Sequence, residues 1–269
     1  MKRLIYQVCL GEQAKSELYK HCIATVKTYC DTHGIDHKVQ TKPILRISPD
    51  PFTSNRSKEA TAKHGGFLPI YEKENAFMYL GVYDQVAVID ADVMIREGAS
   101  NIFDELGDAA FAAVPERSMP LNDVYLDKIR NYSRMQFTNL TDVNWNWNKD
   151  GADFSNMGVM LFDKKLLPFF KGQTPKQFLS RFEFKRFIDG EGAWKWSTDQ
   201  VLLNWWLKKA KVPFKVLDWK YNGLYGANKS IDRCDFVHFF LKDKLPNRGE
   251  DVQALLKSIE DTPDRVYLN

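Results

Sequence analysis

The sequence predicts an α/β fold in which a mostly parallel, Rossmann-like central sheet is flanked by helices. Apolar runs typical of buried strands alternate with segments of helical spacing, and a strand, a helix and a second strand come first. Parallel strands need such crossover connections, which are usually helical. The 269 residues are enough to bury a substantial core. We therefore expect one domain over 1–269.

The N-terminal part is expected to supply the first strands of this sheet. "LIYQVCL" predicts a strand over 4–10, and a helical pattern then continues until Gly34 ends it. A strand over 37–42 and irregular structure over 43–66 come next. The following segments predict a helix over 70–83, one buried strand over 84–95, a short helix over 101–106 and a strand over 109–116.

The C-terminal part begins with a stretch over 117–155 that has no regular pattern and is rich in Asn, Asp, Tyr and Trp. Long polar segments inside a domain are often functional. Thr174 before Pro175 predicts the start of a helix over 174–187. The remaining patterns predict a strand over 157–163, a helix over 197–210 capped by Ser197 or Thr198, strands over 214–218 and 235–240, and a helix over 250–261.

Composition excludes several classes of protein. Apolar residues make up 44% of the chain and charged residues 27%, with a net charge of +3, which disfavours disorder. Because no long Lys/Arg block occurs, we expect no nucleic-acid partner. No window approaches the roughly 18 apolar residues of a transmembrane helix, and the N-terminus lacks the features of a signal peptide. We expect a cytoplasmic protein with reduced cysteines.

The segment "AVIDADVMI" places two carboxylates, Asp90 and Asp92, after an apolar run. In an extended segment residues i and i+2 point to the same side, so both side chains would reach one hard cation. A buried, unpaired aspartate is costly, and a divalent metal or water removes that cost. Open α/β sheets also bind ligands at the carboxyl ends of their strands. The bland alternative is a pair of capping or surface acids.

Four segments in order carry a resemblance to a known family: "QVAVIDADVMI", "FSNMGVMLFD", "STDQVLLNWWL" and "VHFFLKDK". They resemble the D-x-D strand, the Asn-x-Gly-Val strand, the Asp-Gln helix and the late His motif of the GT-A-fold nucleotide-sugar glycosyltransferases. The most similar group is the retaining family 8, typified by glycogenin and bacterial lipooligosaccharide galactosyltransferases. The resemblance spans Leu4 to about Pro246.

The resemblance implies a GT-A fold and the transfer of a sugar, with retention, from a nucleotide sugar to a glycan or lipid-linked acceptor. A UDP-sugar is the favoured donor. A lipid-linked acceptor would bring the protein to the membrane surface. Residues 1–110 would form the nucleotide-binding half, 111–246 the acceptor and sugar half, and 247–269 a C-terminal helix.

By this similarity Asp90, Asp92 and His238 would bind a divalent cation, Mn²⁺ or Mg²⁺. A lone histidine in a strand is more often part of the core. Lys244, six positions after His238, would bind the donor diphosphate, with Lys242 as its neighbouring alternative. A glycine and a Pro-Trp pair usually accompany this motif, whereas this chain has Leu241 and Leu245.

The resemblance also assigns Lys73 and Asn156 to donor binding. The alternatives are a surface lysine on a helix and an asparagine that closes a turn before the strand. The resemblance assigns Asp199 and Gln200 as the catalytic pair. Asp199 would bind sugar hydroxyls, and Gln200 would face the reacting carbon. An acid at the start of a helix also interacts favourably with the helix dipole.

Further binding segments are expected around this site. Gln7–Gly11 and Ser54–Lys58 are candidates for nucleoside binding. The stretch Leu121–Asp153 is the candidate acceptor wall, since aromatic faces stack on sugar rings and amides bind hydroxyls. The tryptophans expected to stack on sugar rings are Trp145, Trp147, Trp194 and Trp196.

Two other functions compete with sugar transfer. A sugar nucleotidyltransferase usually has a Gly-rich, basic loop after its first strand, whereas "CLGEQAKSE" contains one glycine. A non-catalytic carbohydrate-binding protein on the same fold has no need for both aspartates together with His238 and Lys244.

Overall fold

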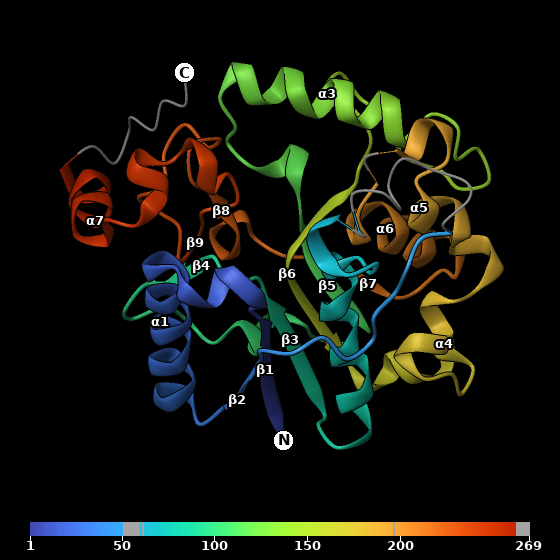
Figure 1. The fold of residues 1–269 in the computed structure, drawn as a ribbon, viewed down its shortest axis with the longest axis horizontal. Coiled ribbons are helices and arrows are strands. Elements are labelled where there is room, and N and C mark those ends of the chain that lie inside the picture. Colours follow the sequence, from blue (N-terminus) through green and yellow to red (C-terminus); the bar gives the residue numbers. More distant parts are fainter. Residues whose placement is uncertain (51–59, 61, 196, 262–269) are drawn as a thin grey trace.

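A six-stranded sheet forms the centre of the computed structural model, which describes residues 1–50, 60, 62–195 and 197–261 (Figure 1). The strand order is β2-β1-β3-β6-β5-β7. Only β6 runs against the other five, because it pairs antiparallel with both β3 and β5. The predicted mostly parallel α/β sheet is confirmed. Its strands are β1 (Arg3–Val8), β2 (Asp36–Gln40), β3 (Gln85–Ile89), β5 (Phe111–Pro115), β6 (Ser155–Asp163) and β7 (Phe214–Val216).

A second, three-stranded sheet has the order β4-β9-β8, formed by Val93–Ile95, Phe236–His238 and Gly223–Leu224. The prediction of one strand over 84–95 is therefore wrong. β3 ends at Ile89, and a turn closed by the Val93 N–H and the Asp90 carbonyl (3.1 Å) leads into β4. Because β4 pairs with β9 and β3 pairs with β1 and β6, the chain changes sheets at Asp90–Asp92.

Helices cover the sheet on both sides. α1 (Glu17–His33) contacts β2, β4 and α7 (Val252–Asp261), and it ends at Gly34 in the left-handed region, as predicted. α6 (Asp199–Lys209) contacts β6. Figure 1 shows α1 and α7 at one end of the molecule and α4 to α6 at the other. No helix in the described part of the chain is long and apolar enough to cross a bilayer.

One helix was not predicted, and one predicted helix was wrong in detail. The stretch over 117–155 contains α3 (Asp123–Phe137), whose N-cap Asn122 accepts a hydrogen bond from the Tyr125 N–H. The helix expected over 174–187 is divided into α4 (Pro175–Leu179), a 3₁₀ turn and α5 (Lys185–Asp189). One continuous helix would not bring Phe178, Phe184 and Phe187 to one side, whereas the break buries these three and leaves the fourth phenylalanine of the segment, Phe182, exposed.

The segment expected to be an α-helix over 70–83 is a 3₁₀ helix over Pro69–Gly81. It is buried along most of its length, including the polar residues Glu72 to Asn75. Glu72 accepts hydrogen bonds from the backbone N–H groups of Ile44, Leu45 and Arg46. This segment is held by polar contacts inside the protein, which explains why an amphipathic pattern described it poorly.

An aromatic cluster joins α4 to α6. The Phe178 ring lies 4.7 Å from the Trp206 ring and 5.0 to 5.9 Å from the rings of Phe77, Phe170 and Phe184. Phe178 is fully buried. This packing fixes α6 against the sheet and thereby positions the start of α6, where Asp199 and Gln200 lie.

We expect Phe178→Ala to lower the free energy of unfolding by about 3–5 kcal/mol, because it removes a ring from a filled cluster and leaves a cavity. The matched control is Phe182→Ala, since Phe182 is 90% exposed and should change stability by less than about 0.5 kcal/mol. Urea unfolding followed by circular dichroism measures both. Equal losses in the two variants would contradict the role of the cluster.

Candidate functional site

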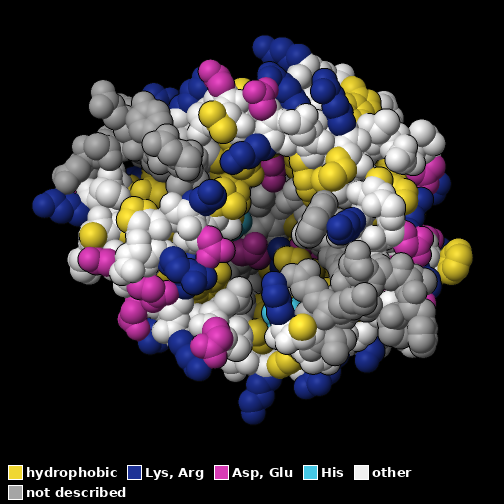
Figure 2. Space-filling view, turned by 45° about the horizontal axis from the view of Figure 1, so that its top comes forward, with side chains coloured by type: hydrophobic (Ala, Val, Ile, Leu, Met, Phe, Trp, Pro, Cys, Tyr) yellow, Lys and Arg dark blue, Asp and Glu magenta, His cyan; other side chains and the backbone are white. Residues whose placement is uncertain are grey.

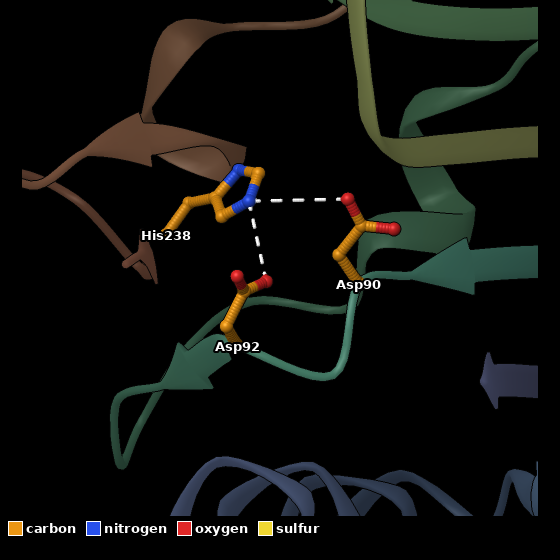
Figure 3. Close-up of side chains that lie close together, drawn as sticks. All are labelled: Asp90, Asp92 and His238. Carbon is orange, nitrogen blue, oxygen red and sulfur yellow. Dashed lines mark ion pairs between the residues drawn. The ribbon is translucent and has the colours of Figure 1, made fainter. Parts of the chain in front are cut away.

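Three side chains with metal-binding atoms converge at the end of β3 (Figure 3). The His238 Nε2 lies 3.3 Å from Asp92 Oδ1 and 3.9 Å from Asp90 Oδ2. One ligand atom from each residue lies within 4.8 Å of the others. The His238 side chain is buried, whereas 31% of the Asp90 side chain and 14% of the Asp92 side chain are exposed. The group is therefore open to solvent on its aspartate side.

The backbone determines this convergence. Val93 in β4 lies opposite His238 in β9, and the Phe239 N–H donates to the Asp92 carbonyl at 2.9 Å. The two aspartates lie in the turn between the sheets, so the expected alternation along one strand is wrong as an explanation. The turn nevertheless brings both carboxylates to one point. Their role as metal ligands, with that of His238, stays a prediction.

The donor atoms fit a divalent cation. Two carboxylates and an imidazole supply oxygen and nitrogen ligands of the kinds that divalent ions such as Mn²⁺ bind. Burial lowers the pKa of His238, but the charge of Asp92, a hydrogen bond to Asp92 and the charge of Asp90 together outweigh burial and raise that pKa. Burial raises the pKa of Asp92, and His238 reverses this so that the pKa is lowered. A cation would take the place of the proton on His238.

Gly158 in β6 makes room for the histidine ring. A Cβ at this position would lie 2.3 Å from the Cε1 of His238 and 2.7 Å from its Nδ1. Real Cβ atoms essentially never approach other atoms so closely, and the ring is confined within the core, so it would have to move. Glycine at 158 is thus a condition for the position of His238.

Lys73 links two parts of the site. Its Nζ lies 3.1 Å from Asp90 Oδ1 and 2.9 Å from Asp199 Oδ2, and it donates to the Met157 carbonyl at 2.9 Å. Its side chain is only 8% exposed, so the alternative of a surface lysine is wrong. Burial lowers the pKa of Lys73, but Asp199 and Asp90 outweigh burial and raise it. Lys73 is the cation that balances the buried carboxylates.

The positive charge of Lys73 does not fully compensate for the burial of the carboxyl groups around it. Burial raises the pKa of Asp199 and of Asp90 by more than Lys73 lowers them. Glu74 is fully buried, and its two carboxyl oxygens have no hydrogen-bond partner among the described residues. Burial and the charge of Asp199 raise the pKa of Glu74 well above its ordinary value, which favours the neutral acid.

A network of amides extends from β6 to the start of α6. Asn156 Nδ2 donates to Glu116 Oε1 at 2.8 Å, and Gln200 Nε2 donates to the same oxygen at 3.3 Å. Gln200 Oε1 accepts from the Met157 N–H at 3.4 Å. Thr198, not Ser197, caps α6 by accepting from the Gln200 N–H. Asn156 lies within β6, so the alternative of a turn-closing asparagine is wrong.

Glu116 was missed from the sequence. It follows the apolar strand β5, is 4% exposed, and touches two residues predicted to face the donor sugar. Burial raises the pKa of Glu116, and its bonds to Asn156 and Gln200 partly oppose that rise. The signal for Glu116 was the same as for Asp90, since in both cases an acidic residue directly follows an apolar run.

The other predicted residues lie around this centre. Gln7 is buried and donates to the Asp90 carbonyl at 3.4 Å. Lys244 is exposed in a 3₁₀ helix over Lys242–Lys244, and its contact with the donor stays a prediction. Lys242 is bound to Ser16 and Glu250, at 2.6 and 2.7 Å. The predicted Ser54–Lys58 segment lies outside the described residues.

The tryptophans differ from the prediction. Trp145 is buried, its Nε1 donates to the Leu140 carbonyl, and its ring lies 4.4 Å from that of Phe137. Its predicted stacking on a sugar is therefore wrong. Trp194 donates to the Gln136 carbonyl and packs on the core. Trp147 is 46% exposed and stays a candidate, and Trp196 lies outside the described residues.

A cavity of about 800 Å³ lies beside the end of β1. Its lining includes Leu10–Gln13, Phe67–Ile70 and Thr198 at the start of α6. Figure 2 shows a hollow near the centre of one face, with acidic side chains at its floor and Lys or Arg side chains around its rim. The molecule therefore has space for a ligand of nucleotide size next to the predicted nucleoside segment.

The sequence matches no family model and no curated protein. Solved structures similar to the chain include several glycosyltransferases. One is involved in glycosylation of the major capsid of PBCV-1, with 12% identity, a TM-score of 0.48, and coverage of 95% of this chain and 100% of that chain. Mouse xyloside xylosyltransferase 1 has 12% identity, a TM-score of 0.48, and coverage of 91% and 100%.

A third is the galactosyltransferase LgtC in complex with donor and acceptor sugar analogues, with 16% identity, a TM-score of 0.45, and coverage of 88% and 87%. These similarities are distant. The activity proposed below depends on the side chains of the site.

We expect Gly158→Ala to displace the His238 ring, to lower the free energy of unfolding by about 1–3 kcal/mol through overpacking, and to weaken Mn²⁺ binding. The control is Gly81→Ala, because a Cβ there would meet no atom within 4 Å and its effect should stay within about 0.5 kcal/mol. Urea unfolding and calorimetric titration with Mn²⁺ measure the two effects. Unchanged Mn²⁺ affinity in Gly158→Ala would contradict the assigned contact.

We expect Lys73→Met to cost about 3–5 kcal/mol of stability, because it leaves buried carboxylates without their cation. Those carboxyl groups would then have raised pKa values in the folded state, so stability is kept at acidic pH and lost as pH rises through those values. Urea unfolding across pH measures this. The control, Lys20→Met, removes an exposed ion pair and should lower stability by less than about 1 kcal/mol. If Lys73→Met loses as little stability as this control, or if its loss does not depend on pH, Lys73 is not the cation that balances the buried carboxylates.

Proposed function

We propose that the chain is a metal-dependent glycosyltransferase that transfers a sugar from a UDP-sugar to a glycan or lipid-linked acceptor, with retention of configuration. The observation that carries the proposal is the convergence of Asp90, Asp92 and His238 at the end of a parallel strand. Ligands of open α/β sheets bind at this edge. Retention is included because the four motifs resemble those of a retaining family.

Asp90, Asp92 and His238 would hold Mn²⁺ or Mg²⁺, which neutralises charge on the diphosphate of the donor. The partly exposed side of the aspartates is where phosphate oxygens have access. Lys244, exposed after β9, would add a second positive charge at the leaving group. Lys73 would fix Asp90 in place while it holds Asp199 near the donor.

The cavity lined by Leu10–Gln13 and Phe67–Ile70 would take the nucleoside. The sugar would then lie over Asn156, Asp199 and Gln200. Asp199 would accept hydrogen bonds from sugar hydroxyls with the oxygen that Lys73 leaves free, and Gln200 would face the anomeric carbon. An amide is a poor nucleophile, so we favour a front-side reaction without a covalent enzyme intermediate.

In this reaction the bond between the anomeric carbon and the β-phosphate oxygen breaks, and the acceptor oxygen forms a bond to the same carbon. The proton of the acceptor hydroxyl passes to the leaving phosphate oxygen. The protein would orient the two reactants and stabilise the charge that develops on the phosphate.

The acceptor would lie along Leu121–Asp153, with Trp147 as an exposed aromatic face. We also propose a cytoplasmic location, at a membrane where the acceptor is lipid-linked.

The decisive measurement is calorimetric titration with UDP in the presence and absence of Mn²⁺, followed by a screen of nucleotide sugars for slow metal-dependent hydrolysis. We expect UDP to bind in the presence of Mn²⁺ and binding to be lost after chelation. Asp92→Ala should abolish hydrolysis and leave the circular dichroism spectrum unchanged, because it removes a carboxylate ligand. The control, Asp108→Ala, removes a fully exposed carboxylate and should hydrolyse the donor at the unmutated rate.

Two outcomes would overturn the proposal. The first is UDP binding that does not depend on the metal, or no binding at all. The second is hydrolysis by Asp92→Ala near the unmutated rate, which would remove the aspartate pair from the reaction.

A further inference from the structure

A continuous chain of hydrogen bonds connects the buried carboxylate of Glu116 to the imidazole of His238. Glu116 Oε1 accepts from Asn156 Nδ2 at 2.8 Å, Asn156 Oδ1 accepts from Asn222 Nδ2 at 2.9 Å, and Asn222 Oδ1 lies 2.9 Å from His238 Nδ1. We propose that Glu116 is a positioning residue that fixes, through these two amides, the tautomer in which His238 presents an unprotonated Nε2 to Asp90 and Asp92.

The direction of the chain is fixed at its first amide. The backbone N–H of Gly158 is 2.9 Å from the Asn156 side chain, and a backbone N–H is only a donor. The Asn156 atom that it meets must be the carbonyl oxygen. The amide nitrogen then points to Glu116, whose ionised carboxylate only accepts. A donor on one side and an acceptor on the other leave Asn156 a single orientation.

The second amide transmits this orientation to the histidine. Asn222 meets the oxygen of Asn156, so it must donate with Nδ2. Its Oδ1 therefore faces His238 Nδ1, and because an amide oxygen only accepts, Nδ1 must carry a proton. In a neutral imidazole the other nitrogen is then an acceptor, and Nε2 is the atom that faces both aspartates. The opposite tautomer would place a hydrogen where a metal ligand needs its lone pair.

The members of this chain are shielded from water. These residues are at most 8% exposed: Glu116, Asn156, Asn222 and His238. In such a setting an amide that loses its partner leaves an unsatisfied polar group, which costs about 1–3 kcal/mol. Glu116 also accepts from Gln200 at 3.3 Å, so one carboxylate orients a residue beside the metal site and a residue beside the sugar site.

The metal part of this inference rests on the proposed function, but the tautomer can be observed in the metal-free protein. Nitrogen-15 NMR at a pH above the His238 pKa distinguishes protonated from unprotonated ring nitrogens. The His238 signals, among those of five histidines, are identified by their loss in His238→Gln. We expect Nδ1 of the unmutated protein to carry a proton, because it faces the Asn222 oxygen. An Nδ1 without a proton would overturn the inference without any variant.

Three variants test the chain itself. Glu116→Leu removes the terminal acceptor and Asn222→Ala removes the amide next to the ring, and both should produce a mixture of tautomers. Both should also weaken Mn²⁺ binding by about 10–100-fold, the usual effect of losing a partner of a metal-binding histidine. Glu116→Gln keeps an acceptor oxygen of nearly the same shape and should restore both the tautomer and the Mn²⁺ affinity.

Unchanged tautomer and Mn²⁺ affinity in Glu116→Leu would overturn the role of Glu116, and Asn222→Ala replaces it in this test if Glu116→Leu does not fold. Failure of Glu116→Gln to restore the tautomer in a folded protein would also overturn it. If the unmutated protein does not bind Mn²⁺, the proposed function fails, while the NMR result still decides whether Glu116 sets the tautomer. The two failures are therefore distinguishable.

Discussion

The site depends on one buried ammonium group. Lys73 contacts Asp90 at the end of β3, Asp199 at the start of α6 and the carbonyl of Met157 in β6. Three segments that are distant in sequence meet at this atom, and each presents an oxygen to it. Without that charge the carboxylates would be too costly to bury together. Charge balance, as much as apolar packing, therefore determines how the centre of the molecule is assembled.

The polar groups around Lys73 stabilise and orient one another. Asp92 and His238 shift one another's pKa in opposite directions, while Glu116 holds the amides of Asn156 and Gln200. Buried polar networks are stable only when their members are satisfied. The exposed edges of Asp90 and Asp92 are where this network still has unused ligand capacity, and this is the property that a binding site needs.

Much of the fold could be predicted because it follows from local periodicity. The parallel sheet, the helix ended by Gly34 and the capped helix at Asp199 all have signals within a few residues. The change of sheet at Asp90 could not be predicted, because it depends on pairing with β9, far along the chain. Trp145 and Lys73 show the same limit, since the burial that defines each of them is a tertiary property.

For the candidate site, the residue types were predictable but their connections were not. Asp90, Asp92 and His238 were identified from motifs, and the structure brings them together. Glu116 was missed because its importance lies in two hydrogen bonds to residues 40 and 84 positions away. Gly158 gave a motif signal, but the reason for glycine there is the ring of His238, which no local pattern contains.

The small sheet of β4, β9 and β8 has a mechanical consequence. Its strands are only two or three residues long, and short pairings of this kind contribute little stability by themselves. An ion bound by the turn before β4 and by the last residue of β9 would hold the two strands together, and it would stabilise the folded state more as its concentration rises above its Kd. The occupancy of the centre would then set how firmly the C-terminal part of the chain is attached to the rest of the protein.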